Sequence, residues 1–102
     1  DYDIPALIRH FAPRIVFGHF RDVVGKVPHF REAFQDTGKT DMAASMRAYH
    51  EAGIDCPVRP DHVPTLVGET NETPGYHMLG RLWAVGYMRG LREAIVGRKA
   101  AS

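Results

Sequence analysis

Helical and extended patterns alternate along this chain of 102 residues. Apolar side chains recur at helical spacing in residues 3–11, 42–52 and 76–97, whereas residues 14–20 and 54–60 form short apolar runs typical of strands. Strands that alternate with helices form a parallel sheet with helical crossovers. Two strands are too few to bury three apolar helix faces. The order therefore predicts the last part of a larger α/β fold, such as a (β/α)8 barrel of about 250 residues.

The helical segments have readable boundaries, and each has one apolar face. Asp3 can cap the first helix, Pro5 suits its first turn and Pro13 ends it. Gly53 ends the second helix. The apolar stripes consist of Ile4, Leu7, Ile8 and Phe11 in the first helix, Met42, Met46 and Tyr49 in the second, and Leu79, Leu82, Trp83, Tyr87, Leu91 and Ile95 in the third.

Two long loops are expected between these elements. Residues 23–40 show no sustained periodicity, and residues 63–75 are rich in Pro, Gly, Thr and Glu. Loops of this length are uncommon in compact domains and often carry function. His29 and Glu32 lie in the first loop, where they are interpreted as solvated residues within reach of a substrate.

Polar side chains gather where both predicted strands end. His19 and Arg21 follow the first strand, and Arg59, Asp61 and His62 follow the second. The carboxyl ends of parallel strands meet at one edge of a sheet, so these side chains are expected to converge. An imidazole beside a carboxylate suits a divalent metal such as Mn²⁺ or Fe²⁺, with further ligands from elsewhere.

Each of these side chains also has a plainer interpretation. A histidine at a strand end is commonly a hydrogen-bonded structural residue, Asp61 can cap a turn, and Arg59 can form a salt bridge to a neighbouring strand. Tyr76 follows a Pro-Gly turn, where it can either pack at a helix start or lie over the same rim. The position of the whole set at two adjacent strand ends favours a site.

Composition excludes several other classes of function. The formal net charge is +1 and the basic residues are dispersed, which argues against a nucleic-acid partner. No apolar run approaches the ~20 residues that cross a bilayer. Cys56 is the one cysteine, so an internal disulfide is impossible and a reducing cytoplasm is expected. It is interpreted as a small buried residue without chemistry.

Several motifs occur in the order found in one enzyme family, and together they cover nearly the whole chain. They are Phe17-Gly18-His19-Phe20-Arg21, Phe30-Arg31-Glu32 with Asp41-Met42, Arg59-Pro60-Asp61-His62-Val63-Pro64-Thr65, Pro74-Gly75-Tyr76, and the glycine-containing third helix from Gly80-Arg81-Leu82 to Gly90-Leu91. In these motifs the sequence resembles the mannonate dehydratases. The chain, residues 1–102, would be the C-terminal segment of a single barrel domain related to the xylose isomerases.

The resemblance implies dehydration of D-mannonate to 2-keto-3-deoxy-D-gluconate in hexuronate breakdown, with Mn²⁺ or Fe²⁺ as cofactor. By motif position it implies metal ligation by His19 and Asp61, acid–base chemistry by His62 and Tyr76, and a substrate-side position for Arg21. We also expect Arg59 to bind the substrate. The family's other ligands, a His and a Cys, belong to earlier strands, and Cys56 does not match that cysteine. One departure is Phe30-Arg31-Glu32, where many members have Phe-His-Glu.

Two rival hypotheses remain at this point. The same metal scaffold would serve a sugar or sugar-acid isomerase, which needs no acid for a leaving hydroxyl. Alternatively, the chain is a non-catalytic barrel fragment that lacks the remaining ligands. A start without Met suggests a piece of a longer polypeptide. The full-length enzyme is expected to be a cytoplasmic homo-oligomer that binds a small sugar acid, with no membrane or nucleic-acid partner.

Overall fold

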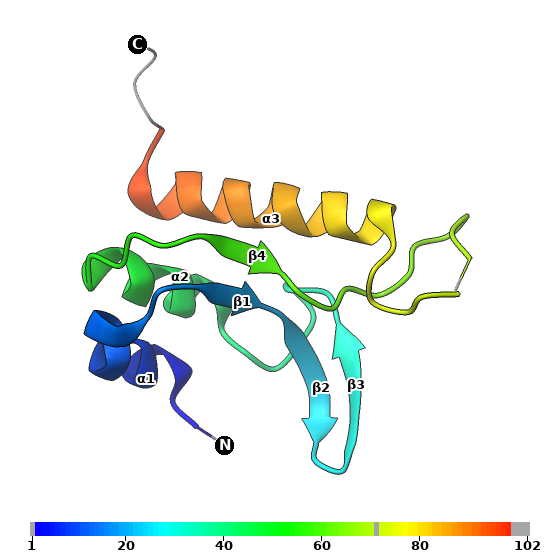
Figure 1. Cartoon of the computed structure of the whole chain (residues 1–102), viewed down its shortest axis with the longest axis horizontal. Coiled ribbons are helices and arrows are strands. Elements are labelled where there is room, and N and C mark those ends of the chain that lie inside the picture. Colours follow the sequence, from blue (N-terminus) through cyan, green and yellow to red (C-terminus); the bar gives the residue numbers. More distant parts are fainter. Residues whose placement is uncertain (1, 71, 99–102) are drawn as a thin grey trace.

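The centre of the fold is a parallel pair of strands, β1 (Gly18–Phe20) and β4 (Val58–Pro60). The structure is a computed structural model that describes residues 2–70 and 72–98. Figure 1 shows both strands pointing the same way, with helices beside and above them. The predicted parallel pairing is confirmed, but both strands are shorter than their apolar runs. The ladder stays short at β4 because Pro57 and Pro60 have no N–H to donate.

Three helices accompany this pair, as the sequence predicts. They are α1 (Ile4–Phe11), α2 (Met42–Glu51) and α3 (Met78–Val96), and a 3₁₀ turn, η1 (Ala12–Arg14), follows α1. Asp3 accepts a hydrogen bond from the N–H of Ala6 at 3.0 Å, so it caps α1 as expected. Asp41 caps α2 in the same way. Within residues 2–70 and 72–98, no helix has both the length and the apolarity needed to cross a membrane.

The prediction of a loop over residues 23–40 is wrong for its first part, because residues 22–33 form an antiparallel hairpin. Its strands are β2 (Asp22–Lys26) and β3 (His29–Ala33), paired from Asp22 opposite Ala33 to Lys26 opposite His29. Figure 1 shows the hairpin projecting away from the parallel pair. Much of it is exposed, so its side chains show little of the apolar and polar alternation from which strands are recognised.

The core lies between the parallel pair and the helices α2 and α3. Phe20, Met42 and Met88 are its buried members. Partly buried side chains that pack against them are Met46, Tyr49, Val58, Tyr87 and Leu91. The predicted stripe of α2 is therefore confirmed, and burial raises the pKa of the Tyr49 hydroxyl, with a further contribution from Cys56.

The apolar face predicted for α1 is mostly uncovered. Ile8 is buried, whereas Ile4 and Leu7 are each 38% exposed and Phe11 is 48% exposed. On α3, Leu82 is 61% exposed, although it belongs to the predicted stripe. The pattern correctly identified both helices, but residues 2–70 and 72–98 do not supply enough packing partners for these faces.

A close approach at Gly38 ties the hairpin to the segment that leads into α2. Asp22, at the start of β2, is 1% exposed, and its carboxylate accepts hydrogen bonds from the N–H groups of Val23 and Thr40. A Cβ added to Gly38 would lie 2.0 Å from the Asp22 carboxyl carbon. Any larger residue would therefore have to displace this buried, hydrogen-bonded carboxylate.

We expect Gly38→Ala to lower the free energy of unfolding by about 1–3 kcal/mol, the usual cost of overpacking a filled site. Gly86→Ala is the control, because a Cβ there meets nothing within 4 Å among the described residues. It should raise stability by about 0.5–1 kcal/mol, since alanine favours a helix interior over glycine. Thermal unfolding of both variants and the parent measures the difference. Equal midpoints for the two variants would contradict the proposed crowding at Asp22.

Candidate active site

The polar side chains predicted to converge lie at the carboxyl ends of β1 and β4. His19 is on β1 and Arg21 follows it directly, while Asp61 and His62 follow β4. Figure 1 shows that the β2–β3 hairpin and the segment after β4 leave from this same end of the parallel pair. The N–H of Asp61 donates to the carbonyl oxygen of Phe20 at 3.4 Å, which continues the ladder past the strands.

The Asp61 carboxylate is the centre of this cluster. Its Oδ2 atom lies 3.6 Å from Nδ1 of His19, 3.9 Å from Nη1 of Arg21 and 3.7 Å from Nε2 of His62. The Asp61 side chain is 16% exposed, whereas that of His19 is 46% exposed. The convergence predicted from the two strand ends is confirmed for these four residues.

A chain of hydrogen-bonding groups runs from the hairpin through His62 to Tyr76. Glu32 Oε1 contacts Nη2 of Arg21 and lies 3.2 Å from His62 Nδ1. The other ring nitrogen of His62, Nε2, is 2.7 Å from the Tyr76 hydroxyl. Tyr76 therefore lies over the rim, as one of its two interpretations predicted.

Glu32 is the site residue that sequence reasoning misplaced. Its side chain is 26% exposed and ion-paired, so it is not a solvated loop residue. The missed signal was a strand pairing, in which Glu32 lies opposite Val23, two residues after Arg21. Had the hairpin been recognised, the opposite charges near its base would have placed Glu32 beside Arg21.

Two other candidates lie apart from the cluster. Arg59 pairs in register with His19, but its side chain is exposed and has no hydrogen bond or ion pair within residues 2–70 and 72–98. His29 is exposed near the tip of the hairpin. Cys56 is only partly buried, beside Tyr49 on the helix side of the strands, and the expectation that it has no chemistry stays a prediction.

The side chains of His19 and Asp61 are close enough to serve as two ligands of one divalent metal. Two ligands that each lie about 2.1 Å from one cation are about 3.0–3.5 Å apart. The observed separation between His19 Nδ1 and Asp61 Oδ2 is 3.6 Å. Within the described part of the chain, no group of three His, Cys, Asp or Glu side chains is arranged to hold a metal. These residues can thus supply only part of a ligand set.

The loop before α3 is fastened by the carboxylate of Glu69. Its oxygens accept from the N–H of Leu66 at 3.0 Å, from that of Leu79 at 3.0 Å and from that of Gly80 at 3.3 Å. Leu79 and Gly80 are in the first turn of α3, so Glu69 caps this helix from the loop. This contact closes the loop that carries Tyr76.

Glu69 makes this fastening sensitive to acid. Desolvation raises the pKa of Glu69, but the backbone hydrogen bonds from Leu66, Leu79 and Gly80 and the nearby His77 together lower it below its usual value. A carboxyl whose pKa is lower in the folded state stabilises that state above its unfolded pKa. The stabilisation is lost as the pH falls through the folded value.

We expect the amides of the first turn of α3 to lose hydrogen-exchange protection as the pH falls below the usual pKa of a glutamate and through the lower folded-state value of Glu69. Glu69→Gln should already reduce this protection at pH 7, because the charge that accepts the three N–H groups is gone. Glu72→Gln, on the same loop and exposed, is the matched control and should behave as the parent. Hydrogen exchange followed by mass spectrometry over residues 66–80 measures both effects. Parental protection in Glu69→Gln would refute the capping role.

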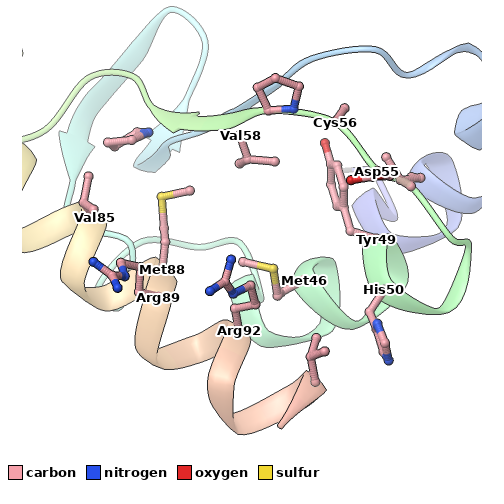
Figure 2. A pocket seen from close by; sticks show the side chains of 14 residues that line it. Met46, Tyr49, His50, Asp55, Cys56, Val58, Val85, Met88, Arg89 and Arg92 are labelled. Atoms are coloured by element: carbon pink, nitrogen blue, oxygen red, sulfur yellow. The ribbon is translucent and has the colours of Figure 1, made fainter. Parts of the chain in front are cut away.

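A separate groove of about 460 Å³ lies on the helix side of the strands. Figure 2 shows Met46, Tyr49 and Met88 around it, with the guanidinium groups of Arg89 and Arg92 nearby. None of the clustered site residues lines this groove. The groove and the polar cluster therefore belong to different faces of the parallel pair.

A parallel strand–helix–strand unit with carboxylates, imidazoles and a phenol at the carboxyl ends of its strands defines an α/β enzyme segment. The model of the D-mannonate dehydratase (UxuA) family matches residues 1–102. The chain belongs to this family, and the resemblance noted in the sequence is confirmed.

Individual relatives show how much of the family's length is present. The chain is 37% identical to mannonate dehydratase 2 of Halalkalibacterium halodurans, with 91% of this chain and 28% of the relative covered. It is 38% identical to the mannonate dehydratase of Brachyspira hyodysenteriae over 91% of this chain and 27% of the relative. The crystal structure of mannonate dehydratase from Streptococcus suis serotype 2 matches with a TM-score of 0.84 at 28% identity, covering 98% of this chain and 32% of that one. The chain thus spans less than a third of these proteins.

Proposed function

We propose that this chain is the C-terminal part of a (β/α)8 barrel enzyme that dehydrates D-mannonate to 2-keto-3-deoxy-D-gluconate in hexuronate breakdown. The observation that carries the proposal is the convergence of His19, Asp61, His62 and Tyr76 at one edge of a parallel strand pair, in a chain of this family. The activity would belong to the longer polypeptide, because part of a metal site cannot hold the metal alone.

The two faces of the parallel pair support the barrel. Phe20 and Val58 pack in the core formed with the helices, whereas His19 and Arg59 are exposed on the other face. In a (β/α)8 barrel the helices cover the outside, and the other face of the strands lines the interior. Arg59 would then point into the barrel near the substrate, which supports its proposed role in binding an anionic sugar acid.

Dehydration breaks the C2–H and C3–O bonds of the substrate. A base takes the C2 proton, the electron pair of that bond forms the C2–C3 double bond, and the C3 hydroxyl leaves as water with a proton from an acid. The resulting enol takes up a proton at C3 and releases one from its hydroxyl, which gives the 2-keto-3-deoxy acid.

His62 and Tyr76 are suited to these proton transfers. One proton is taken and one is given in the elimination, and a proton can pass between His62 Nε2 and the Tyr76 hydroxyl, which are 2.7 Å apart. Either member can therefore act as the base while the other acts as the acid. Arg21, which contacts both carboxylates of the cluster, would also lie against the substrate.

His19 and Asp61 would hold the divalent cation, Mn²⁺ or Fe²⁺, together with ligands from elsewhere in the barrel. When bound, the cation would supply Lewis-acid stabilisation of negative charge on the substrate's carboxylate and hydroxyl oxygens. The donor set of one imidazole and one carboxylate, with a separation of 3.6 Å, supports this assignment.

The test is turnover by the full-length polypeptide supplied with D-mannonate and Mn²⁺. We expect a 2-keto acid product that has lost one water, identified by mass spectrometry and by ultraviolet absorbance of a keto-acid derivative. A product of unchanged mass would favour a sugar-acid isomerase instead. The isolated 102-residue chain is expected to show no turnover. Absence of any product from the metal-loaded full-length protein would overturn the proposal.

A further inference from the structure

We infer that Glu32 is a positioning residue that fixes the ring of His62 for proton transfer. The inference rests on the proposed function, in which His62 and Tyr76 carry protons. Glu32 is delivered by the β2–β3 hairpin, which begins directly after Arg21 and returns to the site at Glu32. Most side chains of strand β3 face solvent, but the Glu32 carboxylate is turned inward.

A single oxygen atom of Glu32 holds two site residues. Its Oε1 accepts from the guanidinium of Arg21 and faces Nδ1 of His62 at 3.2 Å. The second oxygen, Oε2, is buried and has no hydrogen-bond donor within residues 2–70 and 72–98. The contact is therefore not a simple ion pair between hairpin and strand, since His62 shares the same acceptor.

This arrangement selects one tautomer of His62. A carboxylate can only accept hydrogen bonds, so Nδ1, which lies 3.2 Å from Glu32 Oε1, must carry the proton, whereas Nε2 lies 3.7 Å from Asp61 Oδ2, too far for a hydrogen bond. In the neutral imidazole the other nitrogen, Nε2, then has a free lone pair. Nε2 lies 2.7 Å from the Tyr76 hydroxyl, so the hydroxyl donates the hydrogen bond and Nε2 accepts it. The opposite tautomer would place a lone pair against the Glu32 oxygen.

The consequence is a directed chain from Glu32 through His62 to Tyr76. The carboxylate orients the ring, as an acidic partner does for histidine in other acid–base sites. Glu32 itself touches no reacting atom in this chain of contacts. Its loss should lower the rate of proton transfer far more than substrate affinity, because Asp61 Oδ2 still lies 3.9 Å from Nη1 of Arg21.

The test uses two variants of the full-length enzyme. Glu32→Met removes the acceptor at similar volume, and Glu32→Gln keeps one oxygen that can accept from Nδ1. We expect kcat to fall about 10- to 100-fold in Glu32→Met, the usual effect of losing an outer-shell partner. The fall should be smaller in Glu32→Gln, and KM should change by less than about threefold in both. Arg31→Gln, the exposed neighbour on the same strand, should keep the parental kcat.

A second measurement does not depend on activity. Nitrogen-15 spectra of ring-labelled histidine at neutral pH should show His62 protonated at Nδ1 in the parent and as a mixture of tautomers in Glu32→Met. A parental kcat or a parental tautomer in a folded Glu32→Met protein would overturn the inference, as would a raised KM with unchanged kcat. If Glu32→Met does not fold, an unchanged kcat in Glu32→Gln overturns it instead. If the parent fails to dehydrate mannonate, the proposed function fails, and the tautomer still decides whether Glu32 positions His62.

Discussion

Asp61→Ala is expected to remove both the bound divalent metal and mannonate dehydration from the full-length enzyme. Asp61 Oδ2 lies within 4.0 Å of nitrogen atoms of His19, Arg21 and His62, so its loss affects every contact at the centre of the cluster. A metal ligand supports several kcal/mol of charge stabilisation, and each 1.36 kcal/mol is tenfold in rate. We therefore expect kcat to fall by about 10³-fold or more.

The backbone contact of this position is kept in the variant, because the hydrogen bond to Phe20 uses the main-chain N–H. Metal content measured by plasma mass spectrometry, together with kcat, checks the expectation. Asp55→Ala is the matched control, since Asp55 is exposed on the segment leading into β4 and lies outside the cluster. Survival of both metal binding and turnover in Asp61→Ala would show that the ligand assignment is wrong.

His62→Asn is expected to keep the metal and to lower kcat by about 10²-fold or more, the usual scale of acid–base catalysis. The ring of His62 lies between Glu32 and the Tyr76 hydroxyl, and asparagine cannot carry a proton between them. His50→Asn, on the exposed side of α2, is the control and should leave kcat unchanged. Metal analysis and steady-state kinetics of both variants measure the effect. Parental turnover in His62→Asn would exclude the acid–base role, and loss of metal would indicate that His62 is a ligand.

Local patterns in the sequence were sufficient for the main elements of the fold. Asp3 and Asp41 cap helices whose apolar spacing predicts their positions, and the alternation with strands predicts the parallel pair. The hairpin could not be predicted in this way. Both of its strands are largely exposed, so they are formed by backbone pairing. Because few of their side chains are buried, the sequence shows little of the apolar pattern that marks a strand.

The site was predictable to the extent that strand ends determine it. His19, Arg21, Asp61 and His62 converge because parallel strands bring their carboxyl ends together. Tyr76 depends on the loop held by Glu69, and Glu32 depends on the hairpin register, so neither placement follows from periodicity. The roles in metal binding and catalysis remain predictions for the experiments above.

At the tip of the β2–β3 hairpin, the number of residues matters more than which residues they are, because the register of the hairpin sets the direction of Glu32. Side chains alternate between the two faces of a strand, so a one-residue deletion between the hairpin turn and Glu32 would turn this carboxylate away from His62. Substitutions at the exposed tip would leave the face of Glu32 unchanged. Among diverging copies of this protein, the exposed tip of the hairpin should therefore accept exchanges of residues freely but tolerate gaps poorly.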